Sequence, residues 1–243
     1  MKIAIIETGL PPEEIRSDFA SYPEMIKELI QTASTEPTFN TYSFCHSAFT
    51  PSDIPAIENY DGFIVTGSPA GVYEDWPWMQ PLFEFIRQAA ARKKPLVGIC
   101  FGHQAIAQAL GGEVTKSPKG WGIGLHTYEI TTTPAWMTQP QSQLSLAVSH
   151  QDQVITQPPN SKILAHSEFT SFAALYYPDT PALTFQGHPE FANDYSEALY
   201  SLRAKTSLIN EDVQAAIESL SKPEDNELVA KWMWEFFLHH TQA

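Results

Sequence analysis

Four short, strongly apolar runs constrain the fold of this chain more than any other feature. The runs are Ile3–Ile6, Phe63–Thr66, Leu96–Ile99 and Ala182–Phe185. Each has few polar residues and ends at Gly, Pro or a polar turn, which is typical of parallel strands buried on both faces. Apolar residues at helical spacing lie between them, in Tyr22–Thr32 and Trp78–Arg92. Alternation of strand and helix predicts βαβ units and a mostly parallel sheet.

The remaining segments predict additions to this core. Leu125–Ile130 and Leu144–Val148 resemble half-exposed strands and predict an antiparallel extension. Helical patterns near 193–204, 211–220 and 226–238 predict a helical C-terminal extension at about 191–243. The last of them carries Trp232, Phe236 and Phe237, which predicts a face that docks on the core. We find no repeat, low-complexity tract or Gly/Ser linker, so we expect one domain over residues 1–243.

The charge balance excludes two classes of partner. The 243 residues hold 14 Lys and Arg against 28 Asp and Glu, a net charge of −14. Nucleic-acid binding depends on cationic side chains, and so does binding to an anionic membrane surface, so we expect neither. The surplus lies in the flanks: residues 1–61 carry −7 and residues 190–243 carry −6, whereas residues 62–189 carry −1.

Cofactors, metals and membrane spans also lack a sequence signal. No stretch approaches the roughly 20 apolar residues of a membrane span, and the first apolar run is too short for a signal peptide. Neither CxxC, HExxH nor a Gly-rich nucleotide loop occurs, so we predict no metal and no cofactor. Two cysteines, Cys45 and Cys100, exclude a disulfide scaffold and favour a reducing compartment, so we expect a cytoplasmic protein.

The most informative motif surrounds Cys100. The apolar run Leu96–Ile99 leads into Gly98-x-Cys100-x-Gly102, and an Ala-rich helical segment follows. This order of strand, tight turn and helix predicts a nucleophile elbow with a cysteine as the nucleophile. At a helix N-terminus the dipole and free amides favour a thiolate, and the amide of Phe101 can face a developing oxyanion. The alternative is a small buried cysteine before a Gly-containing helix turn.

A candidate base lies where another apolar run ends, in Gln186-Gly187-His188-Pro189-Glu190. A cysteine thiol needs a base to be ionised at neutral pH. His188 would take the thiol proton and return it to the leaving amine, while Glu190 would orient the imidazole and stabilise its charged form. By itself a His two residues before a Glu is weak evidence, but together with the elbow it predicts a Cys100–His188–Glu190 triad.

Gly-Ile-Cys-Phe-Gly-His-Gln and Gly-His-Pro-Glu-Phe resemble the two signature motifs of class I (triad) glutamine amidotransferases. The chain is most similar to the glutaminase domain of GMP synthase and its stand-alone relatives, from about residue 40 to 190. The resemblance implies an α/β, flavodoxin-like open sheet with helices on both faces. It also implies thiolate attack on the glutamine side-chain amide, a γ-glutamyl thioester, release of ammonia and hydrolysis to glutamate.

The resemblance implies further site residues. Thr66-Gly67-Ser68-Pro69 is similar to the family's Gly-Gly-Pro loop, so Gly67 and Ser68 would complete the oxyanion hole with Phe101. Gln104 matches the glutamine on the helix that touches the substrate. Ser149, His150, Gln151 and Asp152 resemble the segment that binds the α-amino and α-carboxyl groups of the substrate, with Gln151 in place of the family's glycine.

Several alternatives remain open from the sequence. Only 53 residues follow Glu190, and they contain no synthase motif. Either a separate synthase subunit receives the ammonia, or the enzyme simply hydrolyses a γ-glutamyl peptide or polyamide. A non-catalytic regulatory module that keeps the fold is a third hypothesis, and the presence of Cys100, His188 and Glu190 argues against it. Trp76 and Trp78, after the Gly67 loop, fit either a wall of the substrate pocket or core packing.

Overall fold

A computed structural model describes residues 1–204 and 210–241. Its centre is a nine-stranded sheet in the order β2-β1-β3-β4-β11-β10-β9-β6-β7, and β5 and β8 form a separate two-stranded sheet. The strands are β1 (Lys2–Glu7), β2 (Thr38–Ser43), β3 (Gly62–Val65), β4 (Leu96–Ile99), β5 (Glu113–Lys116), β6 (Gly122–Ile130), β7 (Gln143–His150), β8 (Asp152–Thr156), β9 (Lys162–His166), β10 (Ala174–Tyr177) and β11 (Ala182–Phe185).

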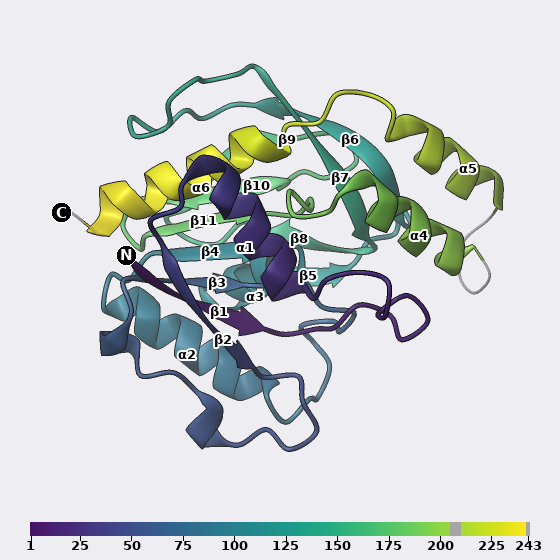
Figure 1. Ribbon diagram of the computed structural model, residues 1–243. Helices are drawn as coiled ribbons and strands as arrows, with labels where there is room; N and C mark the ends of the chain where they lie inside the picture. Colours follow the sequence, from purple (N-terminus) through teal and green to yellow (C-terminus); the bar gives the residue numbers. More distant parts are fainter. Residues whose placement is uncertain (205–209, 242–243) are drawn as a thin grey trace.

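The helices cover both faces of this sheet (Figure 1). They are α1 (Tyr22–Ala33), α2 (Met79–Ala91), α3 (Phe101–Ala109), α4 (Asn193–Arg203), α5 (Asn210–Ser219) and α6 (Asn226–Thr241), with two short 3₁₀ turns at Pro51–Asp53 and Ile57–Asn59. Strands β2, β1, β3, β4 and β11 are mutually parallel, and β11, β10, β9, β6 and β7 pair in antiparallel fashion. The predicted parallel sheet with an antiparallel extension is confirmed.

Alternation along β1 divides the core between the two faces. Ile3 and Ile5 pack with α1 and α6 on one face, whereas Ala4 and Ile6 pack with α2 and α3 on the other. All four side chains are fully buried, as the apolar runs predict. In α6, Trp232, Met233, Phe236 and Phe237 are 0% exposed, which confirms the predicted docking face.

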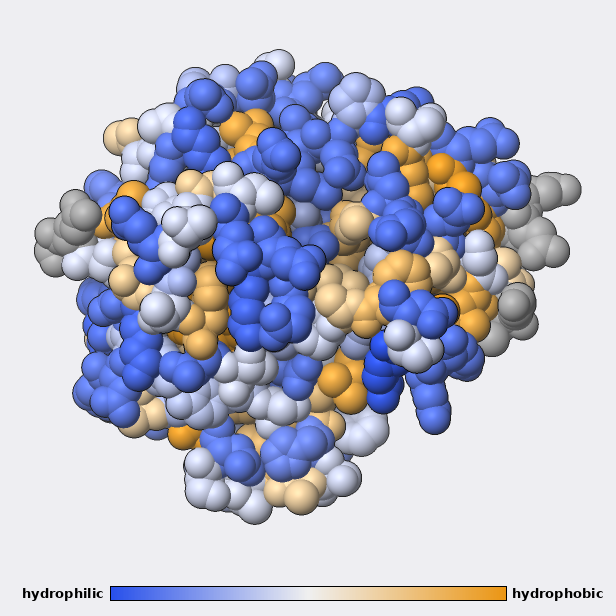
Figure 2. All heavy atoms as spheres, viewed as in Figure 1, coloured by the Kyte–Doolittle hydropathy of each residue, from blue (hydrophilic) through white to orange (hydrophobic). Residues whose placement is uncertain are grey.

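The four predicted core strands appear where they were expected, apart from a one-residue shift that places Thr66 just after β3. The edge strand β2 has no apolar run because its side chains are half-buried or exposed. The predicted half-exposed strand in β7 is more buried than expected, because Ala147 is covered by Tyr200 of α4 and Val213 of α5. Figure 2 shows hydrophobic residues at the surface in the region of these two helices.

Among the described helices, none is long and apolar enough to cross a membrane.

Strands β1, β3, β4 and β11 are parallel, so their carboxyl ends lie at one edge of the sheet. Both chain termini lie near the other edge, where these strands begin (Figure 1). The loops that follow these strands therefore meet at one edge, which is the usual location of ligand sites in open α/β sheets.

Candidate active site

Cys100 occupies the tight turn between β4 and α3. Its backbone has φ 51° and ψ −102°, a conformation that residues with a side chain rarely adopt. The turn is held on both sides: the Cys100 N–H donates to the Phe185 carbonyl at 2.8 Å, and the Gln104 N–H donates to the Cys100 carbonyl at 3.1 Å. A strained backbone at the residue between a strand and the helix that follows it is the conformation of a nucleophile elbow.

The two glycines beside Cys100 are required by close packing. A Cβ on Gly98 would lie 2.6 Å from the backbone of Gly102, and a Cβ on Gly102 would lie 2.2 Å from the Val65 carbonyl oxygen. The Gly102 N–H also donates to the Thr66 carbonyl at 3.1 Å. Helix α3 thus rests directly against β3, and any side chain here would push it away.

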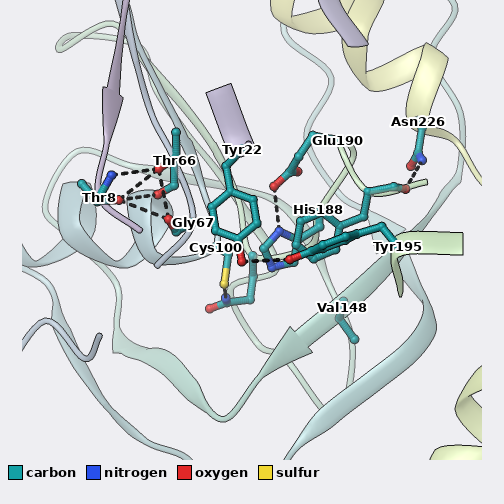
Figure 3. A network of polar contacts seen from close by, with 12 residues as sticks. Thr8, Tyr22, Thr66, Gly67, Cys100, Val148, His188, Glu190, Tyr195 and Asn226 are labelled. Carbon is teal, nitrogen blue, oxygen red and sulfur yellow. Dashed lines mark hydrogen bonds and ion pairs between the residues drawn. The ribbon is translucent and has the colours of Figure 1, made fainter. Parts of the chain in front are cut away.

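His188 and Glu190 form a buried pair after β11. His188 Nδ1 and Glu190 Oε1 are 2.8 Å apart (Figure 3). The imidazole stacks on Phe191, with ring centroids 3.8 Å apart. Burial by itself lowers the pKa of His188, but the Cys100 thiolate and the Glu190 carboxylate outweigh it and raise that pKa above its ordinary value. The imidazole therefore stays protonated more readily than in water.

Gln186, which sequence reasoning missed, links the nucleophile to helix α3. Its Nε2 lies 3.6 Å from Cys100 Sγ, and its Oε1 accepts from Gln104 Nε2 at 3.1 Å. Gln104 Nε2 also donates to the Asp152 carbonyl at 2.9 Å. Both amide hydrogens of Gln104 are thereby used, so only its Oε1 is left to accept a hydrogen bond from a ligand. The only available signal was the place of Gln186, two residues before His188 at the same strand end.

The loop after β3 lies against the catalytic residues. A Cβ on Gly67 would be 3.2 Å from His188 Cε1 and 3.9 Å from Cys100 Cβ. The Gly67 carbonyl accepts hydrogen bonds from Thr66 Oγ1 at 3.0 Å and Thr8 Oγ1 at 3.3 Å (Figure 3). In a trans peptide the N–H points opposite to the carbonyl, so the Ser68 N–H points away from Thr8. Ser68 keeps a negative φ, so a serine fits here without strain.

The segment from β7 to β8 carries four of the five predicted substrate-binding residues, and all four line a cavity together with Cys100. Burial lowers the pKa of His150 to about 3, so its imidazole is neutral. Nδ1 contacts the Asp152 carbonyl at 3.1 Å and must be the protonated nitrogen, which leaves Nε2 as an acceptor. Ser149 Oγ is buried and has no hydrogen-bond partner among the described residues. Burial raises the pKa of the Asp152 carboxyl, which accepts from Tyr73 OH at 3.1 Å.

Cys100 lies between two cavities. The Gln104 cavity, of about 140 Å³, is lined by Gln104, Lys116, Trp121, Gln151, Asp152 and neighbouring residues. The Arg16 cavity, of about 260 Å³, is lined by Pro11, Arg16, Tyr22, His188, Phe191, Leu199 and neighbouring residues. Both cavities also contain Ser68, Pro69, Cys100, Ser149 and Arg203.

The two tryptophans near this site differ in their surroundings. Trp78 is 5% exposed and packs edge-on against Phe101, which agrees with core packing. Trp76 is 49% exposed and donates from Nε1 to Glu74, so it is not part of the core. Within residues 1–204 and 210–241 no group of three or more His, Cys, Asp and Glu side chains could hold a metal ion.

Comparisons with known proteins found similar sequences and similar structures. The family profile described as "Glutamine amidotransferase class-I" matches residues 17–201. A glutamine amidotransferase-like protein of Schizosaccharomyces pombe is 30% identical over 251 residues, which cover 97% of this chain and 98% of that protein. Gamma-glutamyl peptidase 4 of Arabidopsis thaliana is 33% identical over 143 residues, 57% of each chain.

Two further comparisons extend the similarity. A glutamine-hydrolyzing GMP synthase subunit of Ignicoccus hospitalis is 34% identical over 169 residues, which cover 70% of this chain and 83% of that protein. Among solved structures, a glutamine amidotransferase from Thermotoga maritima aligns over 100% of this chain and 98% of its own, with a TM-score of 0.73 and 19% identity. At that identity the structural match concerns the fold.

Proposed function

The chain belongs to the class-I glutamine amidotransferase family, and we propose that it is a cysteine amide hydrolase that cleaves γ-glutamyl amides, with glutamine as the simplest substrate. The observation that supports this role is that three groups lie close together: Cys100 on its strained turn, the hydrogen-bonded His188–Glu190 pair and the Gly67 loop.

The proposed reaction has two halves. The Cys100 thiolate attacks the γ-carbonyl carbon, and the carbonyl oxygen becomes an oxyanion that the N–H groups of Phe101 and of Gly67 or Ser68 stabilise. The C–N bond then breaks, and His188 donates its proton to the leaving amine, which is ammonia when glutamine is the substrate. Water attacks the γ-glutamyl thioester, His188 accepts its proton, and glutamate leaves as the thiolate re-forms.

We assign the γ-glutamyl group to the Gln104 cavity. That group carries an ammonium and a carboxylate, and the cavity contains charges of both signs: Glu74 and Asp152 against Lys116 and Arg203. Gln104 Oε1 is left as an acceptor, the buried Ser149 hydroxyl has no partner among the described residues, and His150 and Gln151 line the same cavity. Buried polar groups normally have a hydrogen-bond partner, so we expect the polar groups of the substrate to supply the partners that are missing in this cavity.

Covalent labelling tests the role of Cys100. A glutamine analogue with an electrophilic diazoketone in place of the amide should add one label per chain, which intact-mass analysis detects. The Cys45→Ala variant should be labelled like the wild type, and Cys100→Ser should keep its fold, gain no label and lose turnover. An unlabelled Cys100 would contradict the proposal, and unfolding of Cys100→Ser would mean that Cys100 is chiefly structural.

A γ-glutamyl peptidase is the second candidate, because one observation favours it: the Arg16 cavity extends beyond Cys100 on the side of His188. In the amidotransferase alternative, a separate synthase subunit would receive the ammonia, and the acidic flanks are where such a partner would bind. Ammonia release from glutamine, measured beside cleavage of γ-glutamyl peptides and polyamides, separates the two. Fast peptide cleavage with negligible glutamine hydrolysis would exclude the amidotransferase role.

A further inference from the structure

The Arg16 cavity differs from the Gln104 cavity in charge. Among the described residues, its lining contains two guanidinium groups, Arg16 and Arg203, and no Asp or Glu side chain. The whole chain has twice as many acidic residues as basic ones, so a cavity of this kind is not the expected outcome of its composition. Its other walls are largely apolar, from Leu10, Pro11, Pro12, Phe191 and Leu199.

The position of His188 indicates which part of a substrate this cavity would receive. His188 lines the Arg16 cavity and is not part of the Gln104 cavity. The group that protonates the leaving nitrogen must lie within hydrogen-bond reach of it. If the γ-glutamyl group occupies the Gln104 cavity, the amine therefore departs on the side of Arg16.

The size of the cavity argues for an amine larger than ammonia. Ammonia is comparable in size to water, whose share of liquid volume is about 30 Å³. The Arg16 cavity has a volume of about 260 Å³. The cavity therefore has room for a leaving group at least the size of an amino acid.

Arg16 lies in the loop between β1 and α1 and is exposed at the mouth of the cavity. Its Nε donates to the Pro11 carbonyl at 2.9 Å, which ties the guanidinium to the loop that forms the cavity wall. Arginine pairs with carboxylates through charge-assisted hydrogen bonds in a fixed planar geometry. A carboxylate on the leaving amine would therefore meet a cation that is already held in position.

Building on the proposed function, we propose that the Arg16 cavity binds the amine portion of the substrate and that Arg16 recognises a carboxylate on it. The substrate class is then γ-glutamyl amino acids, in which the residue after the γ-glutamyl bond keeps a free α-carboxylate. The chemistry is that of the proposed hydrolysis: the γ-glutamyl C–N bond breaks, the amino acid leaves as the amine, and water releases glutamate from Cys100.

The test compares γ-glutamyl-alanine with γ-glutamyl-alaninamide, which differ only in the charge of the leaving group. Because kcat/KM reports the steps up to release of the amine, the ratio of the two values measures recognition of the carboxylate. We expect the wild type to prefer the free acid by about tenfold, the lower end of what a charge-assisted hydrogen bond supplies. Arg16→Gln should reduce the ratio below about twofold, and Arg16→Lys should keep part of it because its charge remains.

Arg87→Gln is the matched control, because Arg87 lies on the far helix α2 and pairs with Glu84 at the surface. It should leave both rate constants and their ratio unchanged. A wild-type ratio near one, or a ratio that Arg16→Gln does not alter, overturns the inference while hydrolysis of γ-glutamyl-alaninamide and glutamine still supports the proposed function. If the wild type cleaves none of the three compounds and Cys100 takes no label, both proposals fail.

Discussion

At the scale of single residues, the electrostatics of His188 depend on two anions that approach it within a buried site. The side chain of Glu190 is 0% exposed and that of His188 is 5% exposed, so water screens their interaction poorly. The interaction raises the pKa of His188 and holds the proton on the imidazole. One consequence is a pH-dependent contribution to the free energy of unfolding, because a pKa that differs between folded and unfolded states links protonation to folding.

Glu190→Gln should lower stability in a pH-dependent manner. The pKa of His188 is raised in the folded protein above its ordinary value of 6.5, so its contribution is fully present below about pH 6.5 and is lost as pH rises through the folded pKa. We expect Glu190→Gln to lower the free energy of unfolding by about 2 kcal/mol at pH 6 and by less at pH 9. Urea unfolding of the wild type and the variant at both pH values measures the difference between their free energies of unfolding. A difference that does not change with pH would contradict this account.

At the scale of elements, the junction of β4 and α3 determines where the nucleophile lies. The strand is paired to β3 and β11 on its two sides, and the helix begins immediately after Cys100. Contact between Gly102 and the Val65 carbonyl sets the distance between helix and sheet. The elbow is therefore a property of three strands and a helix together.

Gly102→Ala tests that contact. The added methyl group would lie 2.2 Å from the Val65 carbonyl oxygen, so α3 must shift. We expect a loss of about 1–3 kcal/mol in the free energy of unfolding, as for overpacked cores, and loss of Cys100 labelling. Gly120→Ala is the control: φ is +83° but no described atom lies within 4 Å of the new Cβ, so about 1 kcal/mol of backbone strain and normal labelling are expected. Normal labelling in Gly102→Ala would show that the elbow tolerates the shift.

At the scale of the whole molecule, the C-terminal helices are packed into the core at two places. Helix α6 lies beside α1 on one face of the sheet (Figure 1). Trp232 of α6 also donates from Nε1 to the carbonyl of Thr138, in the segment between β6 and β7, at 2.9 Å. Tyr200 of α4 donates to the Val148 carbonyl at 2.7 Å, one residue before Ser149 of the candidate site. We propose on this basis that residues 1–243 fold as one domain.

A single cooperative unfolding transition is the expected behaviour of such a domain. Far-UV circular dichroism and tryptophan fluorescence should give coincident urea transitions. Trp232→Ala should lower the free energy of unfolding by about 3–5 kcal/mol, because a fully buried side chain is removed. Both transitions should therefore move to a lower urea concentration. Trp76→Ala, which removes a half-exposed side chain, should change stability by less than about 0.5 kcal/mol. Separate transitions for the two probes would indicate that the C-terminal helices fold independently.

Burial accounts for part of the difference between the elements that the sequence predicts and those it misses, although β10 is fully buried and was not predicted. Strands β4 and β11 match their predicted bounds because every side chain in them is buried, which produces an unbroken apolar run. Strands β2 and β5 leave no such run, since the sheet edge and the small second sheet expose part of their residues. Short strands of mixed polarity cannot be distinguished from loops by periodicity alone.

Local sequence was enough to predict the parallel core and the motifs around Cys100 and His188, because an apolar run, the Gly98-x-Cys100-x-Gly102 spacing and the His188-Pro189-Glu190 order can each be read within a few consecutive residues. Only the folded chain shows that Thr8 holds the Gly67 loop, that Gln186 meets Gln104 and that Arg16 lines the same cavity as His188. These residues come from separate strand ends and loops. Their chemistry arises only when parallel strands bring their carboxyl ends to one edge of the sheet, a relation that no local pattern contains.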